Sequence, residues 1–137
     1  MLAPEYIIGF QTFFLALLFV SMAFRMKGNY LVHGLTMVVS LVVGWIAVAM
    51  TIPSFLDSSY TATLTKSPLS SGVVGMHIFF GLATLAFGTW LVALWRPRAT
   101  DFATKTKGIW PSLVILWVST YLIGMLVFVA VHTSLLG

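Results

Sequence analysis

Apolar residues fill four long stretches of the chain, and all ten charged residues, seven basic and three acidic, lie outside them. The stretches run roughly from Tyr6 to Phe24, Tyr30 to Leu56, Gly72 to Trp95 and Ile109 to Leu136. Each has about the 20 residues that a helix needs to cross a hydrocarbon core of roughly 30 Å. Because a spanning segment must satisfy its backbone hydrogen bonds internally, which an open sheet cannot do in lipid, the pattern predicts four transmembrane helices.

The composition leads to the same class of protein. Hydrophobic residues make up 60% of the chain and charged residues only 7%, whereas a soluble domain has about a quarter charged residues. We therefore expect one transmembrane domain over residues 1–137, with an all-α fold in which four helices form an antiparallel bundle with short loops. No basic residue precedes the first stretch, so it lacks the n-region of a cleavable signal peptide and is expected to be retained.

The basic residues predict the topology. Six of the seven lie in two connections, "RMKGN" after the first stretch and "RPRATDFATKTK" after the third. The positive-inside rule places both connections in the cytoplasm, and both termini on the outer side of the cell membrane. This topology, reinforced by anionic lipid, accounts for the net charge of +4, so we expect lipid and not nucleic acid as a partner.

Two segments that begin with histidine share one frame. "HGLTMVVSLVVGW" begins at His33 and "HIFFGLATLAFGTW" at His77; each has Ser or Thr seven positions on and Gly at eleven. Offsets of 0, 4, 7 and 11 lie on one face of a helix. The resulting stripes are His33, Met37, Ser40 and Gly44, then His77, Gly81, Thr84 and Gly88, and a third, Trp117, Tyr121, Gly124, Phe128 and His132. Small residues let helices approach closely in lipid, so helix packing alone is one interpretation of these stripes.

Missing residue types exclude much chemistry. The chain has no cysteine, and its four apolar stretches contain no Asp, Glu, Lys or Arg. Ion-coupled transporters, proton pumps and voltage sensors hold such charges within the membrane. The motifs HExxH and GxSxG are also absent, as is an acidic pair for general acid–base work. We expect no catalysis by this chain alone.

The histidines are the strongest candidate ligands. The predicted topology places His77 and His132 near the outer face, where facing helices of a bundle can hold one haem b between two histidines. On the inner side, an imidazole and three thioethers lie near one level: Met22, Met26, His33 and Met37. Such a set suits monovalent copper. The alternative is that no cofactor binds, with each histidine a polar anchor and each methionine a core filler.

Three segments resemble a known family. An H-x-x-x-M pattern opens the second stretch, "HIFFGLATLAFG" lies in the third, and "KGIWPSLVILWVSTYLIGMLVFV" follows a basic loop. Together, over about residues 30–131, they resemble the CtaM-like family of small four-helix membrane proteins, which are maturation factors for haem–copper oxidases. The resemblance implies roles for His33, Met37 and His77. A further histidine of the family is missing at residues 105–107, and His132 has no clear counterpart.

The resemblance predicts a non-catalytic maturation factor that acts through contacts with a partner subunit and through handling of haem or copper. Two alternatives remain open: a permanent accessory subunit of a membrane metalloenzyme, either a terminal oxidase or a copper-dependent monooxygenase, and a small b-type cytochrome. Within this scheme we assign functional roles to His33 and His77, and an interfacial anchor to His132.

Cysteine labelling tests the topology, and the cysteine-free chain gives it a clean background. Thr100→Cys should react with a membrane-impermeant thiol reagent only from the cytoplasmic side, because Thr100 lies in a basic connection. Ser59→Cys should react only from outside. The reverse pattern would overturn the depths assigned to all three histidines.

Overall fold

The computed structural model describes residues 4–97 and 99–132, and every regular element within these ranges is an α-helix. The helices are α1 (Pro4–Met26), α2 (Tyr30–Leu56), α3 (Ser58–Leu64), α4 (Pro68–Trp95), α5 (Phe102–Thr106) and α6 (Trp110–His132). Only the backbone is described for Pro4, Glu5, Ile7, Tyr60, Ala130, Val131 and His132. Among the described residues, α1, α2, α4 and α6 are long and apolar enough to cross a membrane. The all-α prediction is confirmed, and these helices indicate a membrane protein.

The predicted helix boundaries hold at α2 and shift elsewhere. Helix α4 begins at Pro68, before the predicted Gly72, because Ser67 and Ser70 form a capping box: the Ser67 Oγ accepts from the Ser70 N–H at 3.1 Å, and the Ser70 Oγ accepts from the Ser67 N–H at 3.0 Å. Helix α1 extends two residues beyond Phe24, which brings Arg25 into its last turn. The predicted end of the fourth helix at Leu136 lies outside the described residues.

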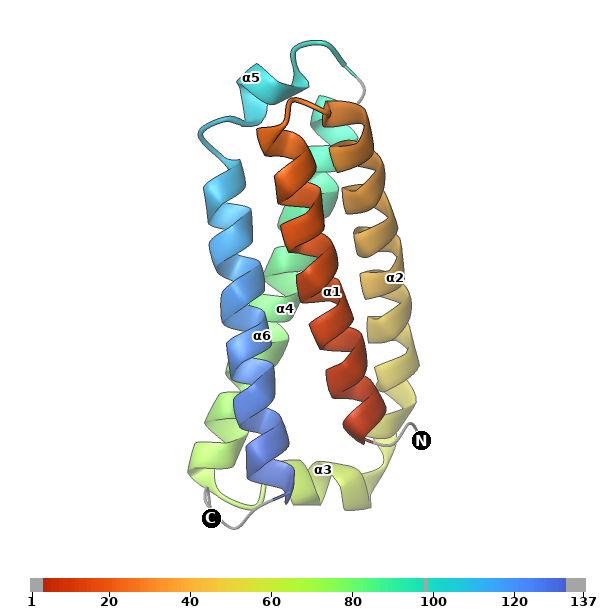
Figure 1. The fold of residues 1–137 in the computed structure, drawn as a ribbon. Coiled ribbons are helices and arrows are strands. Elements are labelled where there is room, and N and C mark those ends of the chain that lie inside the picture. Colours follow the sequence, from red (N-terminus) through yellow and green to blue (C-terminus); the bar gives the residue numbers. More distant parts are fainter. Residues whose placement is uncertain (1–3, 98, 133–137) are drawn as a thin grey trace.

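The four long helices lie alongside one another, and neighbouring helices run in opposite directions (Figure 1). Helix α1 packs against α2 and α6, and α4 packs against α6 and α2. The two short helices cross the ends of this assembly, α3 at the end where α1 begins and α5 at the opposite end (Figure 1). We refer to these as the α3 end and the α5 end.

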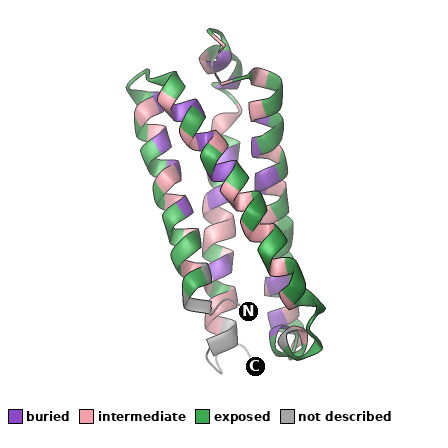
Figure 2. Ribbon diagram, turned by 90° about the vertical axis from the view of Figure 1, so that its right-hand side faces the viewer, coloured by how far each residue is buried: buried purple, intermediate pink, exposed green. Residues whose placement is uncertain are grey.

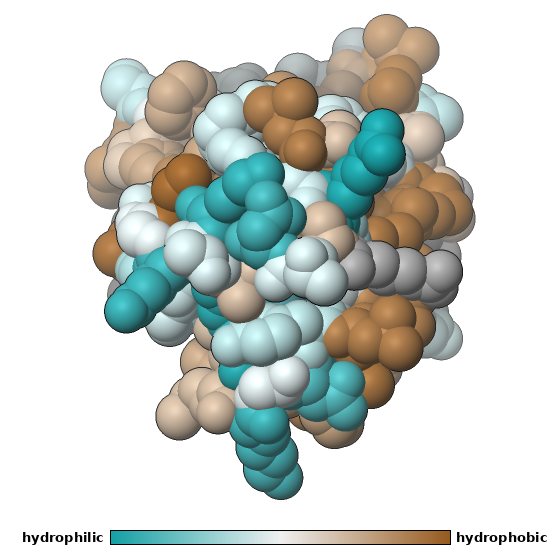
Figure 3. All heavy atoms as spheres, turned by 90° about the horizontal axis from the view of Figure 1, so that it is seen from above, coloured by the Kyte–Doolittle hydropathy of each residue, from teal (hydrophilic) through white to brown (hydrophobic). Residues whose placement is uncertain are grey.

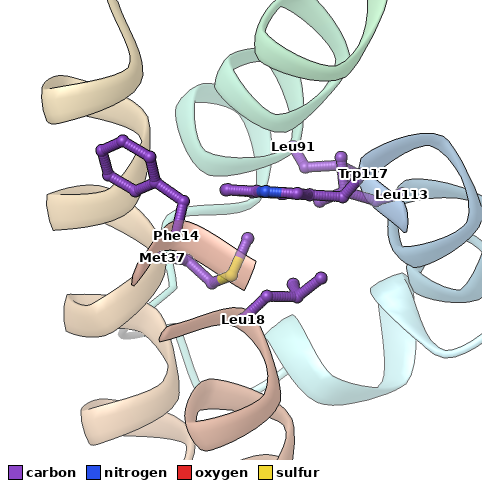
Figure 4. Close-up of a cluster of buried hydrophobic side chains, with 6 residues drawn as sticks. All are labelled: Phe14, Leu18, Met37, Leu91, Leu113 and Trp117. Atoms are coloured by element: carbon purple, nitrogen blue, oxygen red, sulfur yellow. The ribbon is translucent and has the colours of Figure 1, made fainter. Parts of the chain in front are cut away.

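Buried residues lie on the sides of the long helices that face one another, while exposed residues cover the outward sides (Figure 2). All four long helices contribute to one core cluster, Phe14, Leu18, Met37, Leu91, Leu113 and Trp117, which Figure 4 shows in close-up. The outward faces are also apolar, with Phe79 69% exposed and Ile115 66% exposed. Apolar faces of this extent are what a lipid surround requires and what water disfavours.

Glycines on α2 and α4 allow close helix contact. A Cβ built at Gly88 would lie 2.7 Å from Leu41 Cδ2, and one at Gly34 would collide with the ring of Pro97, just beyond α4. A Cβ at Gly81, by contrast, would meet only the Thr120 methyl at 3.6 Å, an ordinary contact. The polar members of the two histidine stripes also face inward, since Ser40 is fully buried and Thr84 is 3% exposed. Ser40, Thr84 and Gly88 of the two stripes therefore lie at contacts between helices.

Two glycine-to-alanine variants test this packing with the same chemical change. Gly34→Ala should destabilise the protein by about 1–3 kcal/mol, because the rigid proline ring has no rotamer with which to yield. Gly81→Ala should be neutral or slightly stabilising, because space is available and alanine favours the helix by about 0.5–1 kcal/mol. Thermal unfolding in one detergent compares the two; equal midpoints would contradict the packing at Gly34.

Candidate functional site

A small cavity lies at the α5 end, between the long helices and beneath α5. Its volume is about 30 Å³, enough for at least one ordered water molecule. Most of its lining is apolar, and it lies against the core cluster of Figure 4, with which it shares Leu18, Met37, Leu91 and Leu113. The lining residues whose side chains could bind a ligand or an ion are Met22, Arg25, His33, Met37 and Thr106.

His33 is held in one orientation by Ser21. Its Nδ1 lies 2.8 Å from the Ser21 Oγ and 3.1 Å from the Ser21 carbonyl oxygen. The Ser21 hydroxyl also lies 3.1 Å from the His33 carbonyl oxygen, to which it donates. With the hydroxyl hydrogen used in this way, Nδ1 carries the ring hydrogen and donates to Ser21. The lone pair of Nε2 therefore stays available, since Nε2 makes no hydrogen bond among the described residues.

The thioethers predicted near His33 separate into two groups. Met22 and Met37 line the same cavity as His33, and Met37 is 6% exposed. Met26 is 85% exposed and takes no part in the cavity. The structure therefore brings together three of the four predicted soft ligands, from helices α1 and α2.

Arg25 is the residue that the sequence pattern missed. The prediction placed it in a connecting loop, but it lies in the last turn of α1 and is only 8% exposed. Its Nη2 donates to the Thr106 Oγ1 at 3.1 Å and to the Ala103 carbonyl oxygen at 3.3 Å. The guanidinium carbon lies 5.5 Å from the centre of the Trp110 ring. Nη1 is buried without a hydrogen-bond partner, and no carboxylate in the described part of the chain pairs with Arg25.

A signal for Arg25 was present in the sequence. Phe14, Leu18, Ser21 and Arg25 have the same offsets, 0, 4, 7 and 11, as the two histidine stripes, and all four are buried. The sequence prediction ended the first apolar stretch at Phe24 because a charged residue, Arg25, follows it. Extending the helical period by one turn would have placed the guanidinium on the inward face.

Helix α5 closes the cavity. Its two buried residues, Phe102 and Thr106, both line the space. The Phe102 ring lies 6.2 Å from the His33 ring, centre to centre, and the Thr106 hydroxyl is bound by Arg25. Helix α5 is thus fixed to α1 by polar contacts and to α2 by a ring contact.

His77 occupies a different environment from His33. Its Nδ1–H donates to the Thr120 carbonyl oxygen at 3.1 Å, and its Nε2 accepts a longer hydrogen bond, 3.4 Å, from the Gln11 Nε2. A Cβ at Gly124 would lie 2.8 Å from the His77 Cε1, so this glycine lets the ring approach α6. Both ring nitrogens of His77 are engaged, and the residue links α1, α4 and α6. This geometry favours the packing interpretation for His77.

The predicted haem pair remains a prediction. The backbone of His132 is described but its side chain lies outside the described residues. His132 lies eight residues beyond Gly124, the α6 neighbour of His77, which corresponds to about 12 Å along a helix axis. A haem iron at His77 would also have to displace Gln11 from Nε2.

A double-mutant cycle tests the link between Gln11 and His77. His77→Leu and Gln11→Leu should each destabilise the protein, and their coupling free energy should be about 0.6 kcal/mol, up to about 1.7, as for other interhelical hydrogen bonds in membranes. His77→Gln should be nearly silent, because an amide can also donate and accept. Unfolding in detergent measures all four states of the cycle; a coupling of zero would contradict the link.

The cavity at the α5 end combines two opposing chemistries. One imidazole lone pair and two thioethers form a soft donor set, suited to monovalent copper. The guanidinium of Arg25 opposes a cation and attracts an anion. Within the described residues, no three side chains of the types His, Cys, Asp and Glu form a group that could hold a metal ion.

Comparison of the chain with models of protein families, with curated proteins and with solved structures finds no match.

Proposed function

We propose that the chain is a non-catalytic multi-pass protein of the cell membrane that takes part in the maturation of a haem–copper oxidase, as the resemblance to the CtaM-like family implies. It acts by contact with an oxidase subunit and by transient handling of copper. One observation carries this proposal: His33 and Met37, two positions to which the resemblance assigns roles, line one cavity together with Met22. A sequence pattern on one helix does not by itself require the third residue.

In this proposal the four long helices form an antiparallel bundle across the membrane, with the α5 end in the cytoplasm and both termini outside. The distribution of charge supports this orientation. The basic residues of both connections that the structure describes, Arg25, Lys27, Arg96, Lys105 and Lys107, lie at the α5 end. A view onto that end shows hydrophilic side chains gathered over its middle (Figure 3). The proposed copper site then lies near the inner leaflet, beneath α5.

The geometry favours copper over haem at this site. A cavity of about 30 Å³ has room for an ion or a water molecule and none for a porphyrin. The hydrogen bond from Nδ1 of His33 to Ser21 fixes the imidazole with Nε2 as the free donor, as outer partners of metal-binding histidines commonly do. The copper ion would be the cargo, and His33, Met22 and Met37 would be its ligands.

Arg25 favours transient over permanent loading. Its guanidinium lines the same cavity, and two cations in a poorly solvated space repel each other. A bound Cu(I) ion would therefore be held weakly and released readily to a partner. This property suits a maturation factor better than a permanent metal-containing subunit, which would retain its ion.

Purification from native membranes in mild detergent, with a copper assay and a visible spectrum, tests the function. We expect an oxidase subunit to co-purify in less than equal amount, and Cu(I) to bind at up to about one ion per chain. Equimolar co-purification that survives washing would instead support the accessory-subunit alternative, and a Soret band would support a b-type cytochrome.

Substitutions at the cavity test the ligands. His33→Gln, Met22→Leu and Met37→Leu should each weaken Cu(I) binding by about tenfold or more, because amide and alkyl groups are poor ligands for a soft ion. Met26→Leu is the matched control, since Met26 is 85% exposed and outside the cavity. Oxidase activity in membranes, at matched expression, should fall in the three cavity variants and not in Met26→Leu. Wild-type Cu(I) binding in all three cavity variants would overturn the copper site.

A further inference from the structure

Arg25 has an unmet electrostatic requirement. The side chain is 8% exposed, its Nη1 is buried without a partner, and no described carboxylate pairs with it. Two hydrogen bonds from Nη2 and two aromatic rings, Trp110 and Tyr30, offset part of the cost of burying the charge. A buried cation without an anion is nevertheless expensive, so a group outside this chain should complete the site.

The missing group is an acceptor. Trp95 carries a second buried N–H at the α5 end without a partner, and Lys105 lies 5.2 Å from the centre of its ring. The two fully buried polar atoms without a partner at this end, Arg25 Nη1 and Trp95 Nε1, are therefore both donors. The nearby acid, Asp101, is already paired with Lys105, whose hydrogen bond lowers the pKa of that carboxyl below its usual value. A ligand with negative oxygens matches what is left.

We propose that the α5 end binds the phosphate of an anionic phospholipid, with one unesterified phosphate oxygen in the cavity as the acceptor for Arg25. The cavity of about 30 Å³ admits an oxygen atom where a water would otherwise lie, and it leaves the rest of the headgroup outside. This inference rests on membrane insertion of the four helices and requires neither copper nor an oxidase partner. Because the cavity has room for one small group, a phosphate oxygen and a Cu(I) ion would exclude each other from it.

The position of Arg25 fits a headgroup. It precedes the last residue of α1, so it lies where a spanning helix reaches the membrane interface. Among the described residues, the exposed cations around it at the α5 end are Lys27, Arg96, Lys105 and Lys107. Figure 3 shows hydrophilic side chains over the middle of this end and apolar ones around them. Basic pockets between transmembrane helices on the cytoplasmic side are the usual binding places for anionic headgroups.

Lipid nanodiscs test the proposal. We expect the full chain to bind phosphatidylglycerol about tenfold more tightly than phosphatidylcholine in native mass spectrometry. We also expect its thermal midpoint to rise when phosphatidylglycerol is included in the disc. Arg25→Gln should reduce the preference to about twofold, and Lys27→Gln, which removes an exposed cation of the same end, should leave most of it.

A second variant distinguishes loss of lipid binding from loss of folding. Val114 lines the cavity from α6, and Val114→Leu adds one methylene there without changing any charge. It should reduce the phosphatidylglycerol preference as Arg25→Gln does. Equal binding of the two lipids by the wild type, or an unchanged preference in Val114→Leu, would show that only water fills the cavity. Stabilisation by inorganic phosphate in phosphatidylcholine discs, equal to that by phosphatidylglycerol, would show a soluble anion instead. Any of these three results overturns the proposal.

Discussion

Lipid tails are as apolar as leucine side chains, so helices in a membrane gain little by hiding apolar faces from their surroundings. Close approach and polar contacts must hold them together instead. The protein uses both means. Gly34 lets the α2 backbone meet Pro97, and Gly124 admits the His77 ring to α6. The polar contacts are sparse but lie between helices, as where Ser21 meets His33.

The polar contacts divide the molecule into two unlike halves. Toward the α3 end, the link through His77 uses neutral groups whose hydrogen bonds satisfy both ring nitrogens, although the Gln11 Oε1 is buried without a partner. Toward the α5 end, Ser21 satisfies only one nitrogen of His33, and Arg25 keeps one donor unpaired. A membrane protein tolerates unmet groups of this kind at an end that water, ions or headgroups can reach. The buried charge of Arg25 and the unpaired Nε2 of His33 therefore both lie at the α5 end.

Most of the fold was predictable because the governing signal is local. An apolar stretch of sufficient length predicts a helix, and the shared offsets of 0, 4, 7 and 11 indicate which face of the helix is buried. The burial of Ser40 and Thr84 agrees with this. The capping of α4 was missed because Ser67 and Ser70 read as a polar loop. The short helices α3 and α5 were not predicted, because both lie in connections that were expected to be short loops, and neither has the length of a periodic pattern.

The candidate site was less predictable, because it depends on how deep each helix end lies. Met22 and Met26 have the same side chain and lie one turn apart, yet only Met22 faces the cavity. Because the two histidine frames are alike, the sequence predicted similar roles for His33 and His77. What distinguishes these histidines is the partner across the helix interface, Ser21 for His33 and Gln11 for His77. Arg25 was misplaced because charge was taken to end a helix.

The two contacts at the α5 end differ greatly in sequence separation, and this has a consequence for biogenesis. Ser21 and His33 are 12 residues apart, so the α1–α2 hairpin can close while the ribosome is still synthesising the chain. Arg25 and Thr106 are 81 residues apart. The first hairpin must therefore leave the translocon, or wait within it, with a guanidinium that has no hydroxyl partner until α5 emerges.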